Sequence, residues 1–186
     1  MAEPSAANAQ SAQRSSGGAG TIKLAGLSMT GNFAPDPVTG ILSGTGQIVR
    51  DNGDRFDGRL VRGKKEGKGQ FIWANGQRYS GDWAGDMPNG RGILNFSGGN
   101  RYEGDVRNGE PHGHGTLRYT SGDVYTGSWA NGKFHGAGKY AWPNGEYWEG
   151  EYKDGKKTAN GKTVFADGRT LVEGGTSGSA PPGTNR

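Results

Sequence analysis

Aromatic residues recur in this chain at a constant interval of 23 residues, without an insertion. Glycine follows each of these aromatics at two fixed distances, 13 and 20 residues further on, and neither glycine column has an exception. A period of this length indicates a repeat architecture, in which each repeat is one small unit that packs against its neighbours. Six repeats are expected, and their first aromatics are Phe33, Phe56, Tyr79, Tyr102, Tyr125 and Trp148.

The composition would point elsewhere if the period were ignored. Of 186 residues, 38 are glycine and 8 are proline, while only 30% are hydrophobic. An unperiodic chain with this much glycine and proline is typically disordered, but most of these glycines fall in repeating columns, so we expect a folded array. The absence of cysteine excludes disulfide scaffolds, cysteine-ligated metal sites and thiol nucleophiles.

Each repeat is predicted to form one β-hairpin. Its first half alternates aromatic and polar residues, as in residues 79–83, and its second half places apolar residues two apart, as in Leu94 and Phe96. Pairs such as Asn108–Gly109 and Asn75–Gly76 supply the positive φ of tight turns at the two ends. The fold class is therefore all-β, an elongated single-layer antiparallel meander over residues 33–171, with repeats at 33–55, 56–78, 79–101, 102–124, 125–147 and 148–170.

The segments that flank the array lack the repeat. Residues 1–20 and 172–186 consist mainly of small and polar residues, which cannot bury enough apolar surface to offset the entropy of ordering. Both are expected to be disordered tails. Residues 21–32 are predicted to form an entry strand that caps the array, because they contain the apolar residues Ile22, Leu24, Leu27 and Met29.

The net charge is +4, from 22 Lys and Arg against 18 Asp and Glu, which is too small and too mixed to indicate a nucleic-acid partner. No apolar run approaches the roughly 20 residues of a membrane-spanning helix, and the first 20 residues lack the apolar stretch of a signal peptide. We expect a soluble protein, cytoplasmic or membrane-peripheral, without nucleic acid. Residues 7–9, Ala-Asn-Ala, resemble the end of a processed export signal, so an exported, periplasmic location stays open.

A set of glycines with fixed spacing follows each aromatic; in the repeat of Tyr102, with His112 before the third glycine, it is Gly104, Gly109, Gly113, Gly115 and Gly122. This pattern resembles the membrane occupation and recognition nexus (MORN) repeat. Residues 125–147 are the closest copy, whereas the first and last repeats depart, as is expected of capping repeats, at Pro35, Pro37, Ala159 and Thr163. The resemblance implies a curved single-sheet ribbon that serves as a non-catalytic interaction module in scaffolds and membrane-associated assemblies, sometimes as a dimer.

Three histidines invite a metal hypothesis, namely His112, His114 and His135. Structural packing is favoured instead, because the column that contains His112 and His135 also contains Asn89 and Thr158, which are poor metal ligands.

Catalytic and cofactor motifs are also absent. Residues 161–163 end like a phosphate-binding loop, but Lys156 stands where that motif requires its first glycine. The carboxylates of the first strands are interpreted as a solvated charge ladder beside arginines rather than as catalytic pairs: Asp57, Asp82, Glu103, Asp105, Glu149 and Glu151. The sequence therefore predicts no enzyme, metal site or cofactor.

The favoured function is protein binding, by a scaffold that uses its aromatic face and that can self-associate. An open sheet lined with Tyr and Trp suits an extended peptide, a glycan or a second copy. The predicted binding face consists of Tyr79, Trp83, Tyr102, Tyr125, Trp129, Trp148 and Tyr152.

Two alternatives stay open beside protein binding. Basic residues at one turn edge favour an anionic membrane surface, at about 1 kcal/mol per residue, namely Arg62, Lys64, Lys65, Lys68, Lys153, Lys156 and Lys157. Recognition of a cell-envelope glycan by the aromatic face is the other alternative, if the chain is exported.

Overall fold

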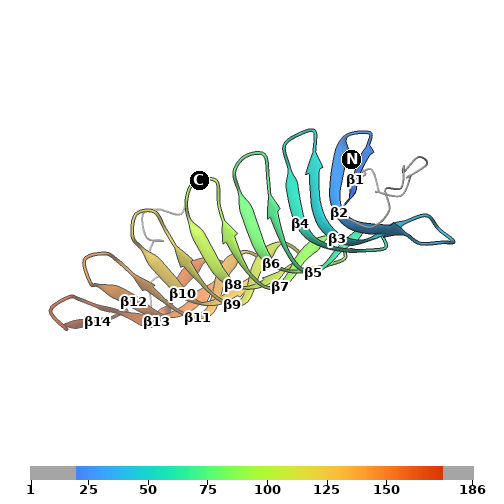
Figure 1. Ribbon diagram of the computed structural model, residues 1–186. Coiled ribbons are helices and arrows are strands. Elements are labelled where there is room, and N and C mark those ends of the chain that lie inside the picture. Colours follow the sequence, from blue (N-terminus) through green and yellow to red (C-terminus); the bar gives the residue numbers. More distant parts are fainter. Residues whose placement is uncertain (1–19, 174–186) are drawn as a thin grey trace. The chain divides into compact units, whose positions relative to one another are not determined.

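The computed structural model describes residues 20–173, which form strands joined by turns (Figure 1). Internal contacts divide the chain into two units, one up to Ser97 and one from Gly98 onward, and each is described by itself. The predicted tails at residues 1–20 and 172–186 lie almost wholly outside the described residues.

Within each unit the strands lie side by side in chain order, and neighbouring strands are antiparallel. The predicted all-β hairpin meander is therefore confirmed. The first unit contains β1 (Gly20–Leu24), β2 (Leu27–Pro35), β3 (Leu42–Arg50), β4 (Arg55–Val61), β5 (Lys64–Ile72), β6 (Arg78–Ala84) and β7 (Met87–Asn95). The second unit contains β8 (Arg101–Arg107), β9 (Glu110–Arg118), β10 (Val124–Ala130), β11 (Lys133–Ala141), β12 (Tyr147–Lys153), β13 (Lys156–Val164) and β14 (Thr170–Glu173).

Two kinds of turn alternate along the chain. Within each repeat from residue 56 onward, the two strands are joined by a two-residue turn in which both residues have positive φ, as in Asn108 (51°) and Gly109 (83°). This is the turn expected of Asn-Gly, because its twist matches that of the strands. Between repeats only the glycine has positive φ, and asparagine acts through its side chain: Asn75 Oδ1 accepts from the Gln77 amide at 3.0 Å. The predicted positive φ is therefore present at both edges, but at the second edge only the glycine of each pair supplies it.

The core of each repeat is an aromatic ring that lies over two glycines of its own hairpin. Tyr102 is fully buried, and its hydroxyl donates to the Asp105 carbonyl oxygen at 2.6 Å. A Cβ on Gly104 would stand 2.6 Å from that hydroxyl, and a Cβ on Gly115 would collide with the ring as well. The two glycine positions are thus required by the ring that covers them.

In each hairpin from β4–β5 onward a β-bulge follows the first glycine, as between Gly81 and Trp83. The bulge brings Tyr79 and Trp83 edge to face, with 5.4 Å between ring centroids. Trp83 also packs on Phe56 of the preceding repeat, again at 5.4 Å, and its indole nitrogen donates to the Gly69 carbonyl at 3.1 Å. Each tryptophan of this kind therefore couples its repeat to the one before it.

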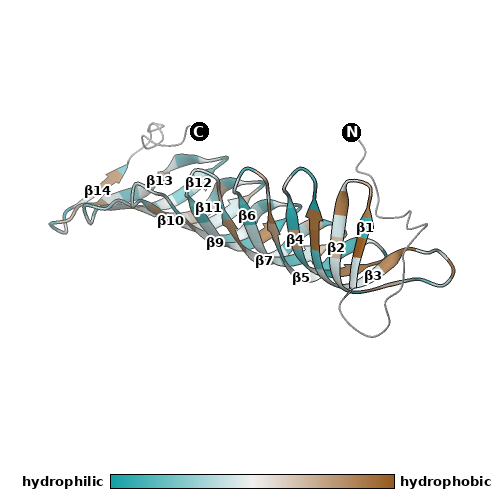
Figure 2. Cartoon of the chain, turned by 45° about the horizontal axis from the view of Figure 1, so that its top comes forward, coloured by the Kyte–Doolittle hydropathy of each residue, from teal (hydrophilic) through white to brown (hydrophobic). Residues whose placement is uncertain are grey.

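The N-terminal strands use aliphatic residues where later repeats use rings, and Figure 2 shows long hydrophobic stretches on β1, β2 and β3. The predicted single entry strand over residues 21–32 was wrong, because a turn at Ala25 and Gly26 divides it into β1 and the first part of β2. At the other end, the predicted tail begins too early, because Val172 lies in β14, which pairs with β13.

Candidate binding pocket on the first unit

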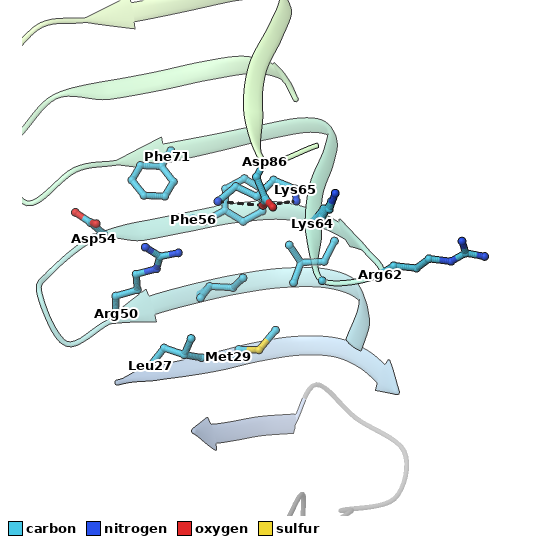
Figure 3. A pocket seen from close by; sticks show the side chains of 13 residues that line it. Leu27, Met29, Arg50, Asp54, Phe56, Arg62, Lys64, Lys65, Phe71 and Asp86 are labelled. Atoms are coloured by element: carbon cyan, nitrogen blue, oxygen red, sulfur yellow. Dashed lines mark hydrogen bonds and ion pairs between the residues drawn. The ribbon is translucent and has the colours of Figure 1, made fainter. Parts of the chain in front are cut away.

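A pocket of about 300 Å³ opens on the first unit (Figure 3). It is lined by residues of β2, β3, β4 and β5, of the turns after β3 and β4, and by Asp86 of the turn after β6. Its apolar lining comes from Leu27, Met29, Ile48, Phe56, Leu60 and Phe71, and its charged lining from Arg50, Asp54, Arg62, Lys64, Lys65 and Asp86.

The pocket lies where the repeat pattern breaks. Arg50 stands 17 residues after the first aromatic of its repeat, and the same position in every later repeat is aromatic: Trp73, Phe96, Tyr119, Trp142 and Phe165. In the next repeat Trp73 packs against Phe71 with 4.7 Å between ring centroids. At the corresponding place beside Ile48 a guanidinium replaces the ring, and the space stays open.

Lys65 is a buried cation of the same lining. Equivalent positions carry Leu42, Pro88, Pro111, Phe134 and a second lysine, Lys157. Lys65 is 8% exposed, and its Nζ lies 5.5 to 5.8 Å from three ring centroids, those of Phe56, Phe71 and Trp83.

Asp86 compensates for this buried lysine. Its Oδ1 accepts from the Lys65 amide at 2.9 Å and from Lys65 Nζ at 3.3 Å. Asp86 holds a φ of 74°, in a column where the other turns have glycine. A buried ammonium group needs a paired carboxylate, so the ion pair accounts for a turn residue that the backbone alone would not favour.

The other lining carboxylate is also engaged. Asp54 Oδ1 accepts from the Ala74 amide and Asp54 Oδ2 from the Asn52 side chain, both at 2.9 Å. The Arg62 side chain extends away from the other lining side chains in Figure 3. The lining as a whole carries two more cationic side chains than carboxylates.

The MORN-repeat model matches five consecutive repeats, at residues 56–78, 79–101, 102–124, 125–147 and 148–168, which together are more than half of the chain. The chain belongs to the MORN-repeat family. The match omits the first predicted repeat, residues 33–55, which is the repeat that carries Pro35, Pro37 and the pocket residue Arg50.

Among solved structures, the MORN chain is similar to the TCP domain of Drosophila melanogaster SAS-4 (dCPAP), solved in complex with a proline-rich motif of Ana2 (dSTIL). That match has 13% identity and a TM-score of 0.46 and covers 88% of this chain and 96% of the other. It is also similar to the TCP10 domain of Danio rerio CPAP, solved with a STIL peptide, at 10% identity and a TM-score of 0.42, covering 79% and 72%. No curated protein sequence matches the chain.

The predicted aromatic binding face lies in the core of the MORN repeats. Tyr79, Tyr102, Tyr125 and Trp148 have no exposed surface, Tyr152 is 1% exposed, and Trp83 and Trp129 are 5% exposed. The prediction that these seven rings contact a partner was therefore wrong. Alternation identifies the apolar face of a strand, but it does not tell whether neighbouring rings already cover it.

Three lysines of the predicted basic edge contact carboxylates or aromatic rings of the protein itself. Lys65 is buried beside Asp86, Lys68 forms an ion pair with Asp82 at 2.7 Å, and Lys157 is half-buried over Trp142 and Trp148 at 5.0 and 4.9 Å. Burial lowers the pKa of Lys157. Lys68 is exposed despite its ion pair, and so are Arg62, Lys64, Lys153 and Lys156.

Carboxylates of the first strands serve the MORN scaffold. Asp82 Oδ2 accepts from the Arg91 amide at 3.0 Å, and Asp105 Oδ2 accepts from the His114 amide at 3.0 Å. The hydrogen bond from Lys68 and that from the Arg91 amide lower the pKa of Asp82. Both aspartate side chains accept backbone hydrogen bonds beside a bulge, which fits their interpretation as structural groups.

Two of the histidines also contact side chains of neighbouring strands and turns. His135 Nδ1 lies 3.6 Å from an Asp154 oxygen, and His114 Nε2 lies 3.3 Å from the Ser128 hydroxyl. Within residues 20–173, no group of three or more acidic or histidine side chains is arranged to hold a metal ion. The same stretch contains no helix long and apolar enough to cross a bilayer.

Proposed function

We propose that this MORN protein is a non-enzymatic protein-binding scaffold. The observation that carries the proposal is the pocket on the first unit, which has an apolar floor and a charged rim and lies in the one repeat where an aromatic column is interrupted. Pockets of this kind, with a few polar groups around an apolar base, are the usual places where a protein holds a partner's side chain.

The chemistry of the remaining side chains supports binding over catalysis. Asp82 and Asp105 accept backbone amides at the bulges, and the hydroxyl of Tyr102 donates to its own strand. An active site needs reactive groups that converge on a substrate, whereas these groups are used by the hairpins that carry them.

The two alternative functions lose part of their support. A membrane surface attracts exposed cations, and the lysines at positions 65, 68 and 157 are held by a carboxylate or by rings. A glycan platform needs exposed aromatic faces, and the seven predicted rings are buried. Protein binding requires neither a row of exposed cations nor exposed aromatic faces.

Selection of peptides from a random displayed library against the full chain tests the proposal. We expect enriched peptides whose synthetic forms bind saturably in calorimetry, with one site per chain. Co-sedimentation with anionic vesicles and a glycan array are run in parallel. Binding to vesicles or glycans in the absence of any peptide binding would overturn the proposal.

A further inference from the structure

We propose that copies of this chain join head to tail, with strand β1 of one copy paired with strand β14 of the next. This inference goes beyond the proposed binding of other proteins, because it assigns a second surface and names its partner. Within residues 20–173, β1 pairs with β2 alone and β14 pairs with β13 alone (Figure 1). Each of the two strands thus has one edge that no described strand occupies, and such edges are templates for pairing with another chain.

Strand β14 is equivalent to the first strand of a hairpin. Leu171 stands 23 residues after Trp148, in the column whose rings from Phe56 to Trp148 are at most 2% exposed. Leu171 itself is 55% exposed. In a complete hairpin the second strand places an apolar residue opposite this column, as Phe71 lies opposite Phe56. β14 therefore presents one half of a hairpin core.

Strand β1 is equivalent to the second strand of a hairpin. Gly20 lies opposite Gly31, which continues the row of paired glycines that runs through the hairpins. Ile22, two residues further on, therefore takes the place that Phe71 has in a complete hairpin. Among the described residues, no first strand lies beside it. β1 thus presents the half of a hairpin core that β14 lacks.

The repeat determines how the two strands meet. In the register of the complete hairpins, Leu171 lies opposite Ile22 of the next copy, and Val172 lies opposite Thr21. Leu171 and Ile22 then share the face that carries the rings, where their apolar surfaces leave water. Residues 174–186 contain no aromatic residue and no Val, Ile, Leu or Met, so they offer no such side chain to Leu171. A second copy supplies one through β1.

The backbone groups of the two edges fit the same register. The hydroxyls of Thr21 and Thr30 lie 3.2 Å apart, the close spacing of an antiparallel pair that exchanges no backbone hydrogen bonds, so Thr21 turns its N–H and C=O outward. In β14 the count starts where the Phe165 amide donates to the Arg169 carbonyl at 2.9 Å. Bonded and outward residues alternate from there, and Val172, the third residue after Arg169, is outward. Thr21 and Val172 can therefore exchange two hydrogen bonds.

Charge favours the pairing of unlike edges. The charged residue of β1 is Lys23, and that of β14 is Glu173. Pairing β1 with β14 joins opposite charges, whereas pairing two β14 edges or two β1 edges brings like charges together. Because the two contacting edges differ, each added copy leaves one β1 edge and one β14 edge open. Such a contact produces a growing assembly unless it closes into a ring.

Two edge variants, measured separately and together, test the head-to-tail contact. Val172→Pro removes an outward N–H from β14, and Thr21→Pro removes one from β1; proline is tolerated at such edge positions. Light scattering coupled to size exclusion should give a wild-type mass that rises with concentration and a monomer for each variant alone. An equimolar mixture of the variants should give a dimer with twice the monomer mass, because each supplies the edge that the other has lost.

Cysteine pairs test the register. The chain has no cysteine, so Thr21→Cys combined with Val172→Cys introduces the only thiols. Oxidation should link the copies into a ladder of covalent multimers on a denaturing gel. Lys23→Cys with Val172→Cys is the matched control, because positions two residues out of register are about 7–8 Å apart, which is too far for a disulfide. It should give roughly tenfold less multimer.

Three results would overturn the proposal. The first is a wild type that is monomeric at every concentration, and the second is a mixture of the proline variants that stays monomeric. The third is self-association of Thr21→Pro alone, or cross-linking of Val172→Cys alone, to the extent of the wild type or the double variant, since either would mean that two β14 edges pair. Circular dichroism and thermal unfolding establish that each variant folds, and the cysteine variants keep every backbone donor if a proline variant does not.

Discussion

At the scale of single residues, the fold depends on an aromatic ring in each repeat that packs over two glycines. Tyr125 is fully buried, and its hydroxyl donates to the Ser128 carbonyl at 2.9 Å. A Cβ on Gly138 would lie 2.7 Å from Cε2 and Cζ of that ring. The glycines of these columns are thus needed for space beneath a ring, and not only for backbone freedom.

Gly138→Ala should therefore destabilise the second unit. We expect a loss of about 1–3 kcal/mol, because the ring has to leave its rotamer or the strands have to separate. Gly98→Ala is the matched control, since no atom lies within 4 Å of its Cβ position and its φ is not positive. Urea denaturation measures both variants, and equal stabilities would contradict the role given to the ring.

Tyr79 makes stability dependent on alkaline pH. Burial, followed by the charge of Asp82, raises the pKa of Tyr79 to about 12 from 10.0. Between these values the unfolded chain releases a proton that the folded chain retains, so stability falls as pH rises, by up to about 1.4 kcal/mol per pH unit. Below pH 10 the contribution is fully present.

Tyr79→Phe tests this dependence. The variant loses the hydrogen bond to the Asp82 carbonyl, which costs about 1 kcal/mol at neutral pH, and its stability should decline less steeply above pH 10. Urea midpoints across an alkaline pH series measure the slope, and a slope identical to that of the wild type would refute the assignment.

At the scale of strands and turns, one turn is exceptional. The turn at Gly85 and Asp86 has φ values of 58° and 74°, and aspartate occupies the place that glycine takes in the other repeats. Its side chain holds Lys65 of the preceding hairpin. This turn therefore links two hairpins through an ion pair as well as through the backbone.

Asp86→Gly should lower stability by about 1–3 kcal/mol although it supplies the better turn residue, because it leaves Lys65 buried without its carboxylate. The double variant with Lys65→Phe reproduces the combination of Phe134 and Gly155, whose backbone groups are joined at 2.8 Å. It should recover most of the loss. Denaturant unfolding of the four proteins in a double-mutant cycle gives the coupling, and additive effects would contradict it.

The repeat register could be predicted from the sequence because one period fixes rings, glycines and turns at once. Burial of the rings could not, because a strand pattern shows which side chains share a face and not how far Trp83 reaches over Phe56. The sequence carries a signal for the pocket, because Arg50 is the single non-aromatic residue in its column. Lys65 carries no such signal, because Lys157 stands in the same column, and its pairing with Asp86 appears only when adjacent hairpins are side by side.

At the scale of the whole molecule, a deletion preserves the strand register only if it removes a whole repeat. Removing residues 125–147 joins Val124 to Trp148 and keeps each ring over its glycines, so we expect cooperative unfolding at a lower temperature. Removing residues 125–146 shifts the strand by one residue, which turns its rings to the opposite face. That variant should lose near-ultraviolet circular dichroism, and similar spectra from the two deletions would contradict the predicted register.

Self-association belongs to the same scale. The strand order ends at β14, where Leu171 and Val172 are 55% and 71% exposed. Apolar edge strands pair readily with other chains, so we expect a mass above that of the monomer that increases with concentration. Light scattering coupled to size exclusion measures it. Leu171→Lys with Val172→Lys should restore the monomer, and a wild type that is monomeric throughout would refute the expectation.

Tryptophans that contact the preceding repeat determine when its core is completed during synthesis. Trp83 and Trp129 donate to carbonyls of Gly69 and Gly115, 14 residues earlier in the chain. A ribosome adds about 5–20 residues per second, so Trp83 is made about 1–5 s after Phe56, the ring that it covers. Until the first strand of the next hairpin is made, that ring stays uncovered. Each such core is therefore completed only after the ribosome has made the first strand of the following repeat.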